Sequence, residues 1–301
     1  MSDGTWQPLP GLPPNELGES PCWLGDEGVL LWVDIPGCAL HEWRPADGRH
    51  RHWALPCEPG CCVPQPGGEV LLPMRDGLFR FDRATGMRVP LAPAPYDPRE
   101  QRFNDGKADP QGRLWVGTIH EPRDRPAAAL YRWQRGRLDR MAGDVTVSNG
   151  LAFSPDGGTL YWSDTKAHCI QALDFDGHDG SLACRRDFAR FAPRPADGSL
   201  AGYGGRPDGA AVDREGALWV AMFEGQRLVR LAPDGTLLSE WPLPVRCPTM
   251  PCFGGDDLRT LFVTTAREKR PADELAAQPW AGCVLQLRVD VPGLPVNYAL
   301  P

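Results

Sequence analysis

The chain has 301 residues, of which 42% are hydrophobic and 24% are charged, and its formal net charge is −7. This composition is typical of an ordinary globular protein, and an acidic chain without a basic stripe argues against a nucleic-acid partner. No apolar run approaches the roughly 18 residues needed to cross a bilayer, so we expect no contact with a membrane. The 34 glycines and 33 prolines are dispersed, which indicates many turns.

Short β-rich runs recur along the whole chain. They begin at residues 30, 70, 114, 160, 218 and 261, and their spacing is close to the roughly 40–50 residues of one propeller blade. Each run follows a tight turn and precedes another alternating strand, at 39–43, 78–81, 129–133, 170–175, 228–231 and 284–289. No segment shows sustained helical periodicity. We therefore predict an all-β fold, a single six-bladed β-propeller domain over residues 1–301, with a fourth outer strand of each blade in the less patterned linkers.

The predicted propeller also accounts for four tryptophans and for two expanded intervals between the runs. Trp32, Trp115, Trp162 and Trp219 occupy equivalent second strands, so we expect them to pack between blades. Two intervals between runs are expanded, one at 118–130 and one before Asp208 that contains 198–205. Long irregular loops on a rigid scaffold often bind ligands, although a neutral insertion is the alternative.

Polar residues recur where the innermost strands are predicted to begin. Glu19, Asn104, Asn149 and Asp208 precede the runs at 30, 114, 160 and 218 by nearly constant distances. This spacing places the four side chains at one level of the inner ring, where they converge on the central channel. Asn-Gly and Asp-Gly pairs can also be plain turns, but glutamate is not a favoured turn residue.

Two carboxylates that converge with two amides need a positive charge. A divalent cation supplies it, and carboxylate and amide oxygens suit Ca²⁺, Mg²⁺ or Mn²⁺. No His or Cys stands at an equivalent inner position, which argues against a closed structural zinc site. Zn²⁺ or Fe²⁺ in an open site stays an alternative.

The histidines and cysteines give weaker signals. His120 is the only histidine in an expanded loop, and contact with a substrate is one interpretation of it. The ten cysteines include the adjacent pair Cys61 and Cys62, for which packing is the expected role. The start, Met1-Ser2-Asp3-Gly4, lacks the basic and apolar regions of a secretory signal. We therefore expect a cytoplasmic protein with reduced thiols.

Several short segments together resemble the signature segments of the regucalcin (senescence marker protein)/gluconolactonase family. They lie at 19–21, 102–107, 148–154, 207–209, 248–250, 252–255 and 264–266, so the resemblance covers nearly the whole chain. It implies a six-bladed propeller with one divalent ion in the channel, held by Glu19, Asn149 and Asp208. It also implies that Asp208 is the catalytic acid and base, and that Arg102 and Asn104 contact the substrate. Glu121 matches a further substrate contact of some members.

The activity that the resemblance implies is hydrolysis of gluconolactone and other five- or six-carbon aldonolactones. A carboxylate beside a metal suits this reaction, because it can take a proton from water and pass it to the ring oxygen. The alternatives are a calcium-dependent phosphotriesterase or arylesterase and a non-catalytic, metal-binding regulatory propeller. A polar mouth with Arg102, Asn104, Glu121 and Arg123 favours a sugar lactone. We expect this small molecule to be the partner of a monomer or weak homo-oligomer.

Overall fold

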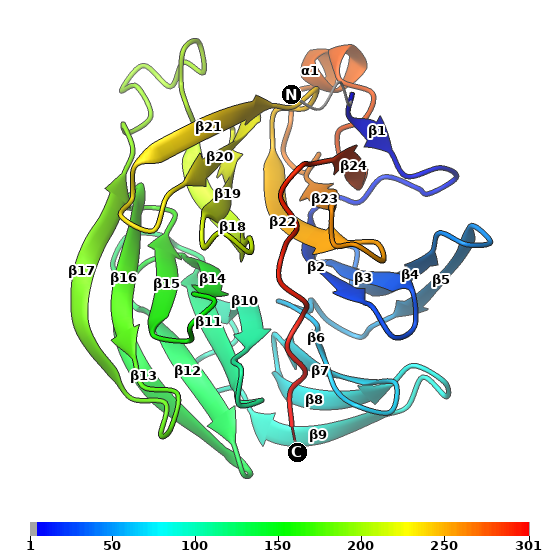
Figure 1. Cartoon of the computed structure of the whole chain (residues 1–301), viewed down its shortest axis with the longest axis vertical. Coiled ribbons are helices and arrows are strands. Elements are labelled where there is room, and N and C mark those ends of the chain that lie inside the picture. The colour runs from blue at the N-terminus through cyan, green and yellow to red at the C-terminus, as the bar shows by residue number, and fades with distance from the viewer. Residues whose placement is uncertain (1–4, 301) are drawn as a thin grey trace.

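The computed structural model describes residues 5–300, and in them six four-stranded antiparallel sheets surround a central axis (Figure 1). The first three sheets contain β2 (Gly18–Leu24), β3 (Val29–Asp34), β4 (Ala39–Arg44) and β5 (Arg49–Ala54); β6 (Val63–Pro64), β7 (Glu69–Met74), β8 (Gly77–Asp82) and β9 (Arg88–Pro93); and β10 (Gln101–Ala108), β11 (Leu114–His120), β12 (Ala128–Gln134) and β13 (Arg137–Val145).

The other three sheets complete the ring. They contain β14 (Ser148–Phe153), β15 (Thr159–Asp164), β16 (Cys169–Phe175) and β17 (Leu182–Arg190); β18 (Arg206–Val212), β19 (Leu218–Phe223), β20 (Arg227–Leu231) and β21 (Leu237–Pro242); and β22 (Pro248–Gly254), β23 (Thr260–Thr265), β24 (Leu285–Arg288) and β1 (Gln7–Pro8). The predicted six-bladed propeller is confirmed, and every predicted run is the second strand of a blade. Residues 1–4 and 301, which the domain and leader predictions included, lie outside the described part.

The sixth blade departs from the predicted order. In the first five blades the outer strand follows in the linker, as expected, but the outer strand of the sixth blade comes from the other end of the chain. Gln7 of β1 pairs with Gln286 of β24. A strand of two residues is too short to show a β pattern, so it could not be predicted from the sequence. The same blade carries α1 (Ala272–Ala277) between β23 and β24, a helix too short to show a period.

The four tryptophans lie between blades, as predicted. Trp32, Trp115, Trp162 and Trp219 are 0–1% exposed. Trp115 of β11, for example, shares an apolar cluster with Phe153 of β14 and Leu160 of β15. Each indole N–H donates to a buried side-chain oxygen, on Asn15, Asp109, Ser148 and Asp213 respectively. Burial of side chains of this size is worth about 1.5–3 kcal/mol each, so they join neighbouring blades strongly.

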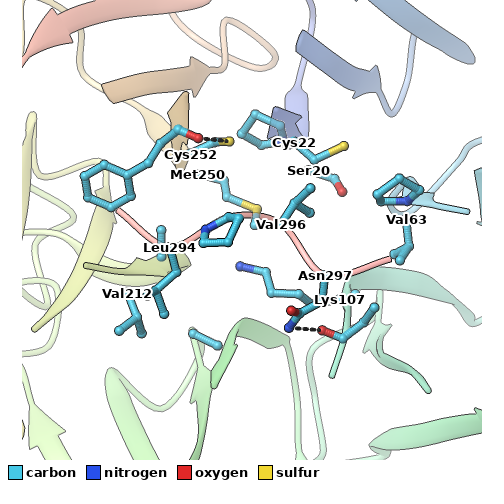
Figure 2. A pocket seen from close by; sticks show the side chains of 18 of the residues that line it. Ser20, Cys22, Val63, Lys107, Val212, Met250, Cys252, Leu294, Val296 and Asn297 are labelled. Atoms are coloured by element: carbon cyan, nitrogen blue, oxygen red, sulfur yellow. Dashed lines mark hydrogen bonds between the residues drawn. The ribbon is translucent and has the colours of Figure 1, made fainter. Parts of the chain in front are cut away.

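The C-terminal segment, residues 289–300, crosses one end of the channel, and we call it the strap (Figure 1). Its backbone N–H groups donate to carbonyls of three other blades, from Leu294 to Val212, from Ala299 to Pro64 and from Leu300 to Gly112. A small cavity of about 100 Å³ remains between the strap and the ends of the inner strands. Figure 2 shows the strap residues Leu294, Val296 and Asn297 lying across it. We call this end the strapped mouth.

Two general expectations can be compared with the described residues. None of their helices is long and apolar enough to span a membrane. All ten cysteines are free thiols. Cys61 and Cys62 are buried and belong to two apolar clusters, so their predicted packing role is confirmed.

Candidate functional site

The opposite end of the channel opens into a cavity of about 930 Å³, and we call it the open mouth. The beginnings of the inner strands and the connections above them form its walls. All six residues predicted for the site line this cavity: Glu19, Arg102, Asn104, Glu121, Asn149 and Asp208. Both expanded intervals contribute as well, with Arg123 from the first and Gly198 and Leu200 from the second. The structure therefore brings the six predicted residues together around one cavity.

A β-bulge stands at each of the four inner-ring residues. The pairing register shifts between Glu19 and Cys22, between Phe103 and Gly106, between Asn149 and Ala152, and between Pro207 and Ala210. A bulge bends its strand and redirects a side chain, so these breaks turn the polar groups into the channel. The spacing of the runs predicted the level of these residues, but not the bulges.

The bulge after Asn149 requires a glycine. Gly150 has φ +60°, a left-handed conformation that favours this residue. A Cβ atom there would also lie only 2.9 Å from the backbone oxygen of Asp208. The Asn-Gly pair therefore does more than turn the chain, because it lets two inner strands approach where their polar side chains meet.

Three hydrogen bonds connect the predicted residues in a chain across three blades. Arg102 Nη1 donates to Asn104 Oδ1 at 2.7 Å, and Asn104 Nδ2 donates to Asn149 Oδ1 at 2.6 Å. Asn149 Nδ2 then donates to Asp208 Oδ1, also at 2.6 Å. Both hydrogens of the Asn104 amide are used, since its nitrogen also donates to the Ser148 carbonyl. Asn104 thus holds Asn149 in place.

The two carboxyl groups of the ring are buried without an ion pair. Glu19 and Asp208 are 9% and 5% exposed, and neither is within salt-bridge distance of a described cation. Burial raises the pKa of Asp208 to about 8, with Arg206 opposing the rise and Asp105 adding to it. Burial likewise raises the pKa of Glu19 well above its ordinary value, and the negative charges of Asp208 and Asp105 raise it further.

These residues fit a hard divalent cation. Two carboxylates and the Asn149 amide oxygen, which keeps one lone pair beside its bond to Asn104, are the oxygen donors such an ion prefers. A positive charge would also relieve the cost of burying two acids together. Among residues 5–300, no cluster of three or more His, Cys, Asp or Glu side chains could hold a metal. The predicted set has only two such residues, because its third ligand is an amide.

Glu121 is held by a neighbouring blade. The Arg75 guanidinium donates to both of its carboxylate oxygens, at 2.9 and 3.0 Å, and also to both oxygens of Glu58. Arg102 Nε lies 3.7 Å from Glu121. Burial opposes ionisation of Glu121, but the hydrogen bonds from Arg75 outweigh it and keep its pKa low. Glu121 is therefore an ionised acceptor on the wall of the cavity.

Other residues correct or extend the predictions. His120 is completely buried, contacts Asp124 Oδ1 at 2.7 Å and does not line the cavity, so its suggested contact with a substrate is wrong in this structure. Sequence reasoning gave no role to Arg75, Arg206 or the 266–274 segment, all of which do line it. Arg206 could have been noticed, because it precedes Asp208 by two residues on the same strand.

Comparison with known proteins gives a consistent result. Residues 17–267 match the family model described as the SMP-30/Gluconolactonase/LRE-like region. The chain is 46% identical over 283 residues to a 6-deoxy-6-sulfogluconolactonase of Pseudomonas putida. The alignment covers 93% of this chain and 94% of the relative. It is 33% identical to the regucalcin of Oryctolagus cuniculus, over 96% of this chain and 97% of that protein.

Among solved structures, the chain is similar to a calcium-binding protein, regucalcin, from Agrobacterium tumefaciens. The TM-score is 0.89 at 30% sequence identity, and the alignment covers 96% of this chain and 95% of the other. Fold and sequence thus agree over nearly the full length.

Proposed function

The chain belongs to the SMP-30/gluconolactonase/LRE-like family, and we propose that it is an enzyme that hydrolyses the ring ester of sugar lactones. The observation that carries the proposal is the bonded chain from Arg102 through Asn104 and Asn149 to Asp208, beside Glu19, at the base of a polar cavity. A cavity of about 930 Å³ has the size of a small-molecule site. The relative named as a lactonase supports the same reaction.

Asp208 is the proposed acid and base. Its Oδ1 accepts the hydrogen bond from Asn149, while its Oδ2 has no hydrogen-bond partner among residues 5–300. Oδ2 can therefore take a proton as the oxygen of water forms a bond to the lactone carbonyl carbon. The same proton then goes to the ring oxygen as the ester C–O bond breaks, which leaves a hydroxy acid. General acid and base assistance of this kind is worth about 10²–10⁴-fold in rate.

Glu19, Asn149 and Asp208 are the proposed ligands of one divalent cation. When bound, such an ion supplies Lewis-acid polarisation of the carbonyl. A base must be ionised near neutral pH, but burial, the largest cause, raises the pKa of Asp208 to about 8 even with Arg206 opposing it. A positive charge at this ring would hold Asp208 ionised. The oxygen donors favour Ca²⁺, Mg²⁺ or Mn²⁺ over a thiolate-seeking metal.

Arg102 is the proposed donor to sugar hydroxyls. Its Nη1 is used by Asn104 and the Phe103 carbonyl, whereas its Nη2 makes no bond among the described residues. Asn104 retains only a lone pair on Oδ1 for a sugar, so its larger contribution is to orient Asn149. Glu121 offers an ionised acceptor nearby. The name of the Pseudomonas relative makes a sulfonated sugar lactone a substrate to test beside neutral ones.

The test measures hydrolysis of a panel of five- and six-carbon aldonolactones. Turnover is monitored by the release of acid. The protein is stripped with a strong chelator and reconstituted separately with Ca²⁺, Mg²⁺, Mn²⁺, Zn²⁺ and Fe²⁺. We expect activity to vanish on stripping and to return with at least one ion. Full turnover by demonstrably metal-free protein would contradict the metal assignment, and no turnover of any lactone with any ion would contradict the proposed function.

A further inference from the structure

The charged side chains of the open mouth fall into two groups with different net charge. The first group, which we call the paired wall, comprises Glu58, Arg75, Arg102 and Glu121. Arg75 bonds both carboxylates in bidentate fashion, and Arg102 approaches Glu121. Two cations therefore meet two anions, and this wall is neutral.

The second group, the cationic wall, has a surplus of positive charge. Six cations compete for three carboxylates: Arg123, Lys166, Arg194, Arg206, Lys269 and Arg270 against Glu224, Glu268 and Glu274. Glu224 is buried and shared by three arginines, with Arg194 at 3.5 Å, Arg206 at 3.3 Å and Arg270 at 3.2 Å. Arg270 also donates to both oxygens of Glu274, and Lys269 pairs with Glu268, which leaves Glu224 to Arg194 and Arg206. One carboxylate for these two arginines, and none among the described residues for Arg123 or Lys166, gives this side of the cavity excess positive charge.

Two cations of this wall have no side-chain hydrogen bond or ion pair within the part of the chain that the structure describes. The side chains of Arg123 and Lys166 make no hydrogen bond and no ion pair to any residue between 5 and 300, although both line the cavity. Arg123 reaches the cavity from a backbone in the left-handed region, with φ +56°. Burial lowers the pKa of Arg123 and the positive charge of Arg206 lowers it further, while the charges of Asp208, Glu268 and Glu121 oppose the fall. Like charges brought together in a cavity favour an anion between them.

The position of these cations relative to the proposed acid is also informative. Arg206 and Asp208 lie on one inner strand, two residues apart. The ring carboxylates do not cancel the surplus, because the proposed divalent cation already balances their two charges. An anion on the cationic wall would thus be a second, separate recognition point beside the reacting ester.

We propose that Arg123, Arg206 and Lys166 form a subsite for a permanently anionic substituent, a sulfonate or a phosphate, at the far end of the lactone. This inference rests on the proposed function and specifies its substrate class: the enzyme selects acidic aldonolactones over neutral ones. Arginine pairs bind such tetrahedral oxyanions through two parallel hydrogen bonds. The paired wall is left to the neutral hydroxyls.

The test compares three lactones that differ only at the last carbon: gluconolactone, its 6-deoxy-6-sulfo derivative and its 6-phospho derivative. We expect wild-type kcat/KM to be at least about tenfold higher for an acidic lactone, since bonds to a charged group are the strong ones. The faster of the two acidic lactones identifies the anion. Arg123→Gln and Arg206→Gln should each reduce the acidic-to-neutral ratio at least about tenfold, and Arg123→Lys should keep most of it. Added salt should lower the ratio.

Arg125→Gln is the matched control. Arg125 lies two residues further along the same connection, pairs with Glu100 at 3.2 Å and does not line the cavity. The acidic-to-neutral ratio of kcat/KM in this variant should therefore equal that of wild type. A wild-type ratio near one, or a ratio unchanged in both Arg123→Gln and Arg206→Gln, would overturn the subsite while hydrolysis itself still stands.

Binding separates the subsite from the reaction. Calorimetric titration with the open-chain product 6-deoxy-6-sulfogluconate needs no turnover, and gluconate is the neutral-tail comparison. Tighter binding of the sulfonated acid, lost in Arg123→Gln, supports the subsite even if every lactone fails to react. Equal binding of the two acids counts against it.

Discussion

The two mouths of the channel are formed by opposite ends of the same inner strands, yet they differ in size and charge. The open mouth encloses about 930 Å³ and is lined by fifteen charged side chains. The strapped mouth leaves about 100 Å³, and Lys107 is the one charged residue among those that line it. Lys107 is itself bonded to the Ala210 carbonyl at 3.0 Å.

Local connections explain the difference. At the strapped mouth each inner strand returns to its neighbour through a tight hairpin, such as the connection from Leu24 to Val29, so little chain is available to build a site. At the open mouth the connections include 121–127 and the segment around α1, which project polar groups over the channel. Binding chemistry is thus concentrated where the scaffold permits irregular loops.

The largest effect should come from the proposed base at the open mouth. Asp208→Asn keeps the size of the side chain but removes its charge and basicity. Metal affinity should weaken, and saturating metal should restore occupancy without restoring turnover, so kcat should stay about 10²–10⁴-fold below wild type. Steady-state kinetics with measured metal content checks this.

Asn149→Asp is the control for that variant. It adds charge to the same ring without supplying a base at position 208, and it should retain metal. If metal-saturated Asp208→Asn turned over its best lactone at nearly the wild-type kcat, Asp208 would be only a ligand. The base would then have to be Glu19, Glu121 or a metal-bound hydroxide.

A smaller effect is expected at the donor end of the bonded chain. Arg102→Ala should leave one metal ion bound and lower kcat/KM at least about tenfold, because a hydrogen bond from a charged group to the sugar in a partly dry site is lost. Metal analysis together with kcat/KM measures both parts. Loss of the ion in Arg102→Ala would show that the assignment of separate roles to substrate and metal residues is wrong.

The strapped mouth provides the opposite test. A chain shortened to end at Gly293 loses the bonds from Leu294, Ala299 and Leu300, so Tm should fall, by roughly 1.6 °C for each kcal/mol lost in a chain of 301 residues. Buried Cys22 and Cys62 should become reactive towards a thiol reagent. kcat/KM should change less than about threefold, which is well under 1.4 kcal/mol. A large loss of turnover with unchanged thiol reactivity would mean that the two mouths are not independent.

A separate prediction concerns the pH dependence of the stability of metal-free protein. Burial raises the pKa of Asp208 from its ordinary 3.8 to about 8, so the folded state binds a proton that the unfolded state has released. The free energy of unfolding of metal-free protein should therefore fall as pH rises from about 4 to about 8. Thermal melts at pH 5 and pH 8 measure this slope. The dependence of the unfolding free energy on pH should be weaker with metal bound and in Asp208→Asn. An unchanged pH dependence in that variant would show that other groups cause it.

Regular repetition is what made the fold predictable from the sequence. Six runs with similar spacing and turns specified six blades, and the level of Glu19, Asn104, Asn149 and Asp208 followed from counting. The two-residue strand at Gln7–Pro8 could not be predicted, because it is a strand only through its pairing with a partner 279 positions away. No local pattern encodes such a pairing. The cationic wall could not be predicted for a similar reason, because most of its residues lie in separate connections that carry no sequence repeat.

The pairing of Gln7 with Gln286 also dictates an order of events during synthesis. A growing chain can form its first five sheets one after another, but its ring stays open until β24 has left the ribosome. Until then the flank of β23 has no neighbour, and an unpaired strand edge invites association with other chains. Closure by such distant partners is slow, because a long loop must be ordered first. Nascent chains stalled before residue 285 should therefore be the species that most needs a chaperone.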